Sequence, residues 1–192
     1  MLKCLRPFRR AFLADRLATF IDKFPRNTIF LTLHEWCGSR AQVIDETTKL
    51  LDNKVLIPSL DCISSRIFAI NHEIEHGNVY TAQGAFERAL SSEVGRLNAS
   101  LWIWYIRFCH AQKELAGKAT DVYFRALNHC PRSKVLLLEA FGTLRVLMKP
   151  EDLEAVYAMM SKQGLRIHVE LDSIVADGGK TSLPSNVSAT TR

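Results

Sequence analysis

The segment His72-Glu73-Ile74-Glu75-His76 has the residue types and the spacing that could do chemistry. On a helix, histidines at i and i+4 lie on one face and can bind zinc, and the glutamate beside the first can activate a zinc-bound water. A zinc hydrolase also needs a third protein ligand and a helix that holds both histidines firmly. The pattern makes zinc hydrolase a candidate function that the neighbouring residues must support.

The residues after this segment weaken the zinc interpretation. Gly77 and Asn78 follow His76 at once, which places the second histidine at the end of the predicted helix. Val79 stands where the metzincin pattern requires glycine, and no downstream helix of the gluzincin type is evident. We interpret the segment as a polar, solvent-facing helix end, predict no catalytic, cofactor-binding or metal-ligating residue, and keep zinc hydrolase as a remote alternative.

The remaining reactive side chains are isolated. Gly178-Gly179-Lys180-Thr181 resembles the end of a phosphate-binding loop, but Ile174 stands where the first glycine of that loop is required. The other histidines have no nucleophile or carboxylate at a suggestive spacing, and we expect them at the surface or capping helices: His34, His110, His129 and His168. No enzyme class follows from these residues.

Composition favours an ordered intracellular protein. The 192 residues are 47% hydrophobic with only nine glycines and six prolines, and the net charge of +5 is dispersed along the chain. No apolar run approaches the roughly 18 residues of a membrane span. The five cysteines are widely separated and lack a CxxC pair, which is typical of reduced thiols in the cytosol or nucleus: Cys4, Cys37, Cys62, Cys109 and Cys130.

The stretch from Ala82 to Phe141 contains nearly the same pattern twice. Ala85-Phe86-Glu87-Arg88-Ala89-Leu90 recurs 37 residues later as Val122-Tyr123-Phe124-Arg125-Ala126-Leu127, and a polar break and a second apolar run follow each copy. Self-similarity at this period, with two helical patterns per unit, predicts an all-α superhelix, or solenoid, of antiparallel helical hairpins. The residues that we assign to the structural signature of the repeat are Phe86, Arg88, Ala89, Leu90, Trp102, Tyr105, Phe124, Arg125, Ala126, Leu127 and Pro131.

Helices are expected along most of the chain. Before the repeat we predict helices within 1–24, over 29–37, 39–51 and 60–76, with a loop over 52–61 and a core stripe of Leu13, Leu17, Phe20, Ile21 and Phe24. After it we predict one long helix over 134–148, a helix from Pro150 that Gly164 ends, and a short closing helix over 167–175. We expect a helical-repeat domain over 1–176, cut from a longer array, and a disordered tail over 177–192.

Several segments resemble half-a-TPR (HAT) repeats, and their order resembles the C-terminal part of the nuclear exosome regulator family, also called the nuclear RNAi-defective family. The resemblance covers roughly Leu17 to Val175. It is carried by Lys23-Phe24-Pro25-Arg26-Asn27-Thr28, Phe68-Ala69-Ile70, Leu101 to Phe108, Tyr123 to Pro131, Lys134-Val135-Leu136, and Leu165-Arg166-Ile167 to Leu171. The resemblance implies a non-enzymatic nuclear scaffold in RNA surveillance, RNA interference or splicing fidelity. In that family an exosome-associated RNA helicase binds a region before the repeats, which we expect to be absent from this sequence.

The resulting hypothesis is a helical-repeat scaffold that binds protein partners of the nuclear RNA-processing machinery and contacts RNA indirectly. The alternative is direct RNA binding by the basic N-terminal face, where Lys3, Arg6, Arg9 and Arg10 gather. We expect Arg88 and Arg125 to bridge to neighbouring helices and Trp102 and Tyr105 to form the core between helices. If the array is cut, Phe12, Leu13 and Leu17 belong to an exposed apolar patch.

Overall fold

A computed structural model describes residues 7–37, 41–57, 59 and 62–165 of the chain. Every regular element within these ranges is helical, which confirms the prediction of an all-α protein. The helices are α1 (Pro7–Lys23), α2 (Thr28–Cys37), α3 (Ala41–Lys54), α4 (Ile63–His76), α5 (Val79–Leu90), α6 (Glu93–Arg96), α7 (Ala99–Ala111), the 3-10 helix η2 (Ala116–Lys118), α8 (Ala119–His129), α9 (Lys134–Glu139) and α10 (Pro150–Lys162).

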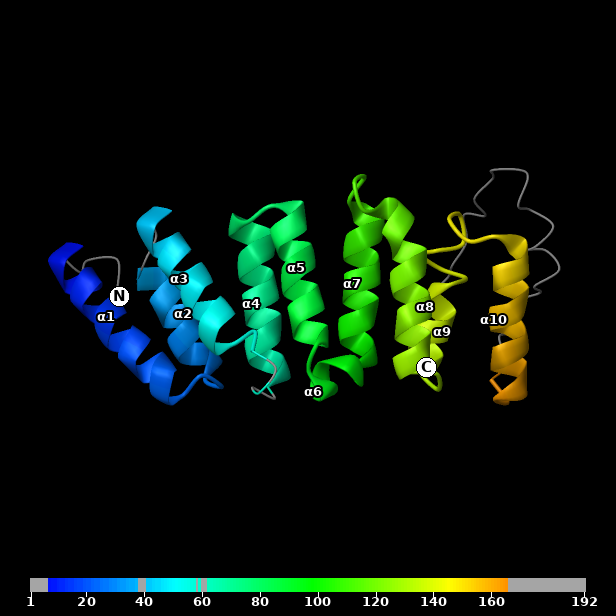
Figure 1. Ribbon diagram of the computed structural model, residues 1–192, viewed down its shortest axis with the longest axis horizontal. Coiled ribbons are helices and arrows are strands. Elements are labelled where there is room, and N and C mark those ends of the chain that lie inside the picture. The colour runs from blue at the N-terminus through cyan, green and yellow to red at the C-terminus, as the bar shows by residue number, and fades with distance from the viewer. Residues whose placement is uncertain (1–6, 38–40, 58, 60–61, 166–192) are drawn as a thin grey trace, which may run out of the picture.

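The helices lie side by side in a row along the long axis of the molecule, from α1 at one end to α10 at the other (Figure 1). Helices that follow one another in the sequence pack together, most extensively α1 with α2, α4 with α5 and α7 with α8. One hydrophobic core runs through the row, from Ile21 in α1 to Met160 in α10. Because each amphipathic helix buries its apolar face only against its neighbours, the core is long rather than spherical.

Helix α5 shows how the sequence positions these elements. Asn78 caps its first turn by accepting hydrogen bonds from the backbone N–H groups of Tyr80 and Thr81, and the Thr81 side chain completes a capping box. The buried face of the helix consists of Ala82, Ala85, Phe86, Ala89 and Leu90. Its three alanines are small and allow α4 to approach closely. Ala69 of α4 is fully buried as well.

Several helix ends lie where the sequence predicts them. Helix α8 ends at His129, two residues before Pro131, as expected from the inability of proline to continue a helix. Pro150 occupies the first turn of α10, where its missing N–H leaves no hydrogen bond unmade. Gly164 follows α10 with a positive φ of 71°, a conformation that glycine adopts without a steric penalty.

The single helix predicted over 134–148 is wrong. Helix α9 ends at Glu139, and turns follow as far as Met148. Within them the Leu144 N–H bonds to the carbonyl of Glu139, five residues back rather than four. Gly142, which has low helix propensity, lies inside this irregular stretch. Leu144 and Met148 are buried, whereas Val146 is 91% exposed, so the segment is not sandwiched within the row.

Other boundaries also differ from the predictions. Helix α3 continues to Lys54, and Val55 and Leu56 after it are buried, so part of the predicted loop over 52–61 closes the core. Helix α8 begins at Ala119 rather than near Glu114, because η2 precedes it.

The polar break before α7 contains α6, a single turn capped by Ser92. The predicted closing helix over 167–175 and the predicted tail over 177–192 lie outside the described residues.

The predicted core stripe of α1 is only partly correct. Ile21 is fully buried, but Phe20 and Phe24 are 46% and 55% exposed. Both rings pack on Phe30 of α2, with centroid distances of 5.6 Å and 6.4 Å. Phe12 is 57% exposed, as the expected apolar patch requires, whereas Leu13 and Leu17 are half-buried.

Candidate functional site

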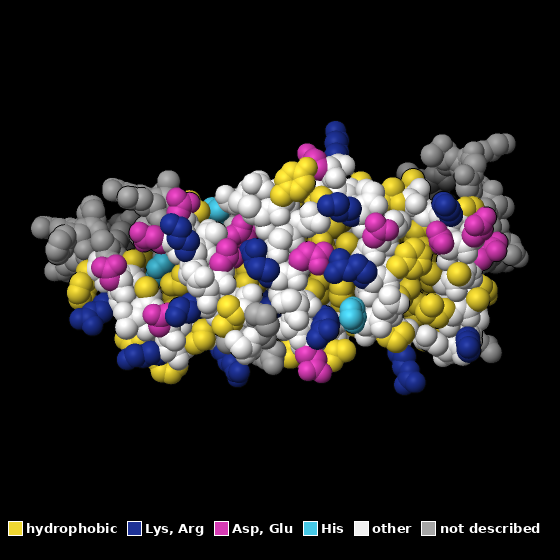
Figure 2. Space-filling model, in the orientation of Figure 1, with side chains coloured by type: hydrophobic (Ala, Val, Ile, Leu, Met, Phe, Trp, Pro, Cys, Tyr) yellow, Lys and Arg dark blue, Asp and Glu magenta, His cyan; other side chains and the backbone are white. Residues whose placement is uncertain are grey.

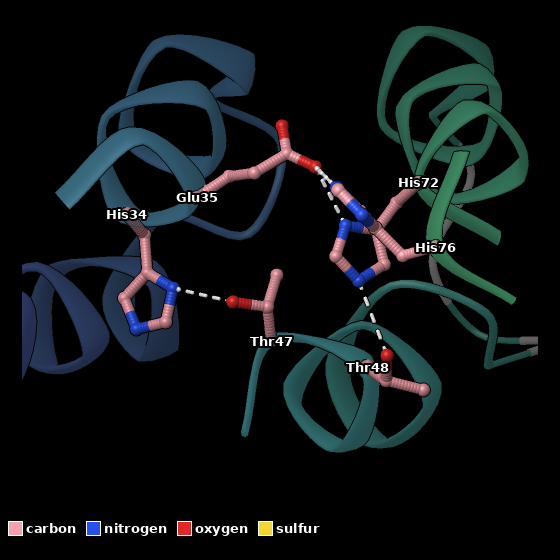
Figure 3. A network of polar contacts seen from close by, with 6 residues as sticks. All are labelled: His34, Glu35, Thr47, Thr48, His72 and His76. Atoms are coloured by element: carbon pink, nitrogen blue, oxygen red, sulfur yellow. Dashed lines mark hydrogen bonds and ion pairs between the residues drawn. The ribbon is translucent and has the colours of Figure 1, made fainter. Parts of the chain in front are cut away.

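The principal polar cluster of the described chain joins three helices near one end of the row (Figure 3). Helix α2 contributes His34 and Glu35, α3 contributes Thr47 and Thr48, and α4 contributes His72 and His76. In each helix the contributed residues are adjacent or one turn apart. Side chains from three successive helices therefore meet at one place.

His72 is the centre of this cluster. Its side chain is 1% exposed, and its Nδ1 lies 2.6 Å from Glu35 Oε1. Its Nε2 lies 3.1 Å from the Thr48 hydroxyl oxygen, so both ring nitrogens have partners. The hydrogen bond with His72 lowers the pKa of Glu35, and burial of the carboxylate only partly opposes this effect. Glu35 is therefore ionised at neutral pH.

His76 completes a group of three possible metal ligands. Its Nε2 lies 3.6 Å from the same Glu35 oxygen, and its ring centroid is 4.9 Å from that of His72. One ligand atom from each of Glu35, His72 and His76 lies within 4.8 Å of the other two. His76 and Glu35 are 31% and 27% exposed in their side chains, so the group opens to solvent on their side. A nitrogen–nitrogen–oxygen donor set of this kind suits zinc and related ions.

The sequence interpretation of this segment as a solvent-facing helix end is wrong for His72 and Glu73, which are 2% and 5% exposed. It holds for Glu75 and His76 at the exposed end of α4. Sequence reasoning also missed the third group, because Glu35 precedes His72 by 37 residues. Zinc hydrolases with this motif carry their third ligand downstream of the two histidines, whereas Glu35 lies upstream.

Glu73 is not one of the three possible metal ligands. A Cβ placed on Gly77 would lie 2.6 Å from Glu73 Oε2 and would also overlap the Thr81 hydroxyl, so the carboxylate lies against the start of α5. A hydrolytic site needs its general base within hydrogen-bond reach of the water bound to the metal. The residue that would serve as base in a zinc hydrolase thus lies beside Gly77 and is not one of the three grouped residues.

The isolated histidines have different environments. His34 is 4% exposed and lies 3.1 Å from the Thr47 hydroxyl, so the expectation of a surface or capping role is wrong for it. Burial lowers the pKa of His34. His110 is exposed, and His129 stacks on Trp102 with a centroid distance of 5.7 Å. His168 lies outside the described residues.

The two copies of the repeated pattern have matching burial. Phe86 and its counterpart Tyr123 are fully buried, and so are Ala89 and Ala126. Leu90 and Leu127 are also buried. Other signature residues are not buried: Phe124 is 39% exposed, Pro131 lies at the surface, and the Arg88 and Arg125 side chains are 42% and 49% exposed.

The paired arginines of the two copies bind carboxylates on an earlier helix. Arg88 of α5 lies 2.8 Å from Asp52 of α3, and Arg125 of α8 lies 2.8 Å from Glu87 of α5. The partners are 36 and 38 residues apart, close to the period of the sequence pattern. Figure 2 shows dark blue and magenta side chains side by side along this face of the row.

An aromatic layer lies beneath these ion pairs. Trp102 is 1% exposed, donates from Nε1 to the Arg96 carbonyl at 2.8 Å, and has the Arg125 guanidinium 5.6 Å from its ring centroid. Tyr105 stacks on Phe86 at 4.8 Å and donates its hydroxyl hydrogen to Glu87. Burial, together with this hydrogen bond to a carboxylate, raises the pKa of Tyr105.

Arg66 is a structural residue that sequence reasoning missed. It is fully buried in α4 and donates to the carbonyl oxygens of Ile57, Arg88 and Ala89 at 2.6 Å, 3.0 Å and 3.3 Å. Two of these carbonyls lie in the last turn of α5, where the helix dipole favours a cation. A single arginine in an apolar stretch carries no sequence signal for this role.

Side chains near helix ends also donate to backbone carbonyl groups of earlier turns: Ser65 is in the first turn of α4, and Cys130 and Gln163 directly follow α8 and α10. Ser65 donates to Pro25, Cys130 to Arg96, and Gln163 to Pro131. The partners are 40, 34 and 32 residues apart. The same kind of contact thus recurs at three places along the row.

These features define the class of the protein. Over its described residues it is an all-α protein of stacked helices, with a cluster of two histidines and one glutamate between α2 and α4. Membrane crossing needs a long apolar helix, and none of the helices in the described part of the chain is of that kind.

Part of the chain is similar to two nuclear exosome regulators. It is 29% identical over 102 residues to nuclear exosome regulator NRDE2 of Homo sapiens, and 28% identical over 102 residues to that of Mus musculus. Each match covers 52% of this chain but only 8% of the relative, so the chain matches a small part of those proteins. The matches support a relationship to that family. No protein-family model and no solved structure matches the chain.

Proposed function

We propose that this protein is a non-enzymatic scaffold of HAT-like helical hairpins that binds protein partners in nuclear RNA processing, in the context of exosome regulation. The proposed repeat domain covers 1–176 and corresponds to the C-terminal repeats of the related regulators, and the proposed site of action is the nucleus. Their name as nuclear exosome regulators supports this choice of process.

The observation that carries the proposal is the recurrence of equivalent contacts at a nearly constant sequence spacing. Arginine–carboxylate pairs recur at 36 and 38 residues, and contacts between side chains and carbonyl groups of earlier turns recur at 32 to 40 residues. Repeats whose units contact mainly their neighbours form extended surfaces, and such surfaces serve as binding platforms.

The proposal is tested by recovering the tagged chain from nuclei, with and without nuclease treatment. We expect subunits of the exosome machinery to be enriched and to remain after nuclease, because the contacts are between proteins. If enrichment disappears with nuclease, and the purified chain binds RNA with an affinity that falls steeply with salt, the RNA-binding alternative replaces the scaffold. If nothing is enriched above an untagged control, the scaffold proposal is wrong.

Two matched double variants show whether capture depends on a surface of the folded chain. Phe24→Ser with Ile29→Ser removes exposed apolar side chains at the α1–α2 turn, and Val135→Ser with Val146→Ser removes them around α9. All four residues are at least 55% exposed, so the core is unchanged. Loss of capture in one variant and not in the other supports a defined docking surface. Equal loss in both, with unchanged thermal unfolding, indicates non-specific adhesion.

A further inference from the structure

We propose that Glu35, His72 and His76 bind a divalent transition-metal ion of the zinc class, and that this ion acts as a non-catalytic clamp between α2 and α4. The three residues come from two helices of the row, so a bound ion would fasten one helical pair to the next (Figure 3). This inference is independent of the proposed scaffold function, because neither needs the other to be correct.

The donor atoms are already close to the spacing that an ion requires. Zinc bonds of about 2.0–2.1 Å in tetrahedral geometry place the ligand atoms about 3.3 Å apart. The separation between His76 Nε2 and Glu35 Oε1 is 3.6 Å, and all three donor atoms lie within 4.8 Å of one another. The distance between His72 Nδ1 and Glu35 Oε1 is 2.6 Å, that of a hydrogen bond. Of the donor atoms, only His72 Nδ1 and Glu35 Oε1 must move apart for an ion to bind. The Glu35 side chain is long and 27% exposed, so it can rotate.

The surroundings of His72 resemble those of a metal-bound histidine. Ligating histidines generally have their second ring nitrogen fixed by a neighbouring polar group, which sets the tautomer and the ring orientation. The Thr48 hydroxyl lies 3.1 Å from His72 Nε2 and can either donate to it or accept from it. With the proton on Nε2 and donated to Thr48, the Nδ1 lone pair is free for the ion. Because His72 is buried, its ring is held in this orientation.

The geometry favours a clamp over a reaction centre. A catalytic zinc site combines its ligands with a base that reaches the metal-bound water. Glu73, the candidate base, lies beside Gly77 and is not one of the grouped residues. The exposed edges of His76 and Glu35 give the ion and a completing water molecule access from solvent. The remaining effect of the ion is mechanical, since it links α2 and α4 across 37 residues of sequence.

The experiment is a titration of the untagged, metal-free chain with zinc chloride, followed by calorimetry and thermal unfolding, and with cobalt chloride, followed by visible absorption. We expect a single saturable ion per chain, a rise in the unfolding midpoint and the absorption bands of tetrahedral cobalt. Hydrogen exchange in α2 and α4 should slow when zinc is bound. No saturable binding of either ion overturns the proposal.

Amino-acid substitutions distinguish this site from adventitious zinc binding by a surface histidine. His76→Gln and Glu35→Gln should weaken zinc binding at least about tenfold, and Thr48→Val should weaken it by about 10–100-fold because Thr48 holds the ring of His72. His110→Gln is the matched control, since His110 also lies in the last turn of its helix and is exposed. Wild-type affinity in His76→Gln and Glu35→Gln, or equal weakening in His110→Gln, overturns the proposal. Unfolding of the metal-free variants verifies that each one folds.

Discussion

Arg125 and Glu87 form a two-pronged ion pair, with Nη1 2.8 Å from Oε1 and Nη2 2.8 Å from Oε2. Glu87 also accepts a hydrogen bond from Tyr105 at 2.8 Å, so one carboxylate links α5, α7 and α8. The Arg125 guanidinium lies near the Trp102 ring at the same time. An arginine fork satisfies this geometry and a lysine does not, because an ammonium group cannot make two parallel bonds and stack on a ring.

We therefore expect Arg125→Lys to destabilise the protein even though the charge is retained. The side chains are 49% and 38% exposed, so the coupling energy between Arg125 and Glu87 should stay near about 1 kcal/mol, the upper end for solvent-exposed pairs. A double-mutant cycle with Glu87→Gln in urea unfolding measures it. The single contact between Lys54 and Asp22, at 48% and 54% exposure, is the control and should couple by only about 0–0.5 kcal/mol. Equal coupling in the two cycles would show that the fork has no special role.

The lowered pKa of Glu87 predicts that the stability of the protein depends on pH. The hydrogen bond from Arg125 lowers the pKa of Glu87 below its ordinary value of 4.5, with Tyr105 assisting and burial opposing. Because the pKa is lower in the folded state than in the unfolded state, Glu87 stabilises the fold above pH 4.5 and loses this contribution as pH falls through its folded value. The gap in urea midpoint between wild type and Glu87→Gln should therefore shrink from pH 7 toward pH 3. A gap that stays constant over this range would contradict the assignment.

Substitution of Trp102 tests how much the core that runs through the row contributes to stability. The indole is 1% exposed, and its Nε1–H is satisfied by the Arg96 carbonyl. Trp102→Ala should cost about 3–5 kcal/mol in unfolding free energy, since it leaves a large cavity and removes one of the hydrogen bonds to the Arg96 carbonyl. Trp36→Ala is the matched control, because Trp36 is 43% exposed and its removal should change stability by no more than about 0.5 kcal/mol. A loss below about 1 kcal/mol for Trp102→Ala would remove the residue from the core.

The elements that sequence predicted well are those whose signals are local. Alanines and large apolar residues at helical spacing indicate the buried face of α5, and Pro150 and Gly164 mark the ends of α10, because each acts on its own turn of backbone. The predicted length of α9 is wrong because the apolar composition over 134–148 suits a helix and a compact turn equally well.

The candidate site could not be predicted for a different reason. The contact between Glu35 and His72 depends on which faces of α2 and α4 meet, and no spacing within either helix carries that information. The role of Arg66 could not be predicted for the same reason, since it donates to backbone carbonyl groups, which every residue has. Burial of His34 and His72 likewise follows from the packing of three helices rather than from either residue's neighbours.

The surroundings of Gly95 in α6 indicate that the turn between α5 and α7 is tightly packed. A Cβ at this position would overlap the carbonyl oxygen of Ala89 and approach the Ser92 hydroxyl, and the carbonyl belongs to a buried helix end that also receives Arg66. Because backbone cannot move aside as a flexible side chain can, Gly95→Ala should cost about 1–3 kcal/mol.

Gly117→Ala is the control for this substitution. Gly117 lies in η2 with no neighbour within 4 Å of an added Cβ, and its φ is not positive. Alanine there restricts the unfolded chain without a clash, so it should leave stability unchanged or raise it by up to about 1 kcal/mol. Urea unfolding of the two variants beside wild type makes the comparison. If Gly95→Ala were as stable as Gly117→Ala, α6 would not be held against the end of α5, and the close packing of this turn would be refuted.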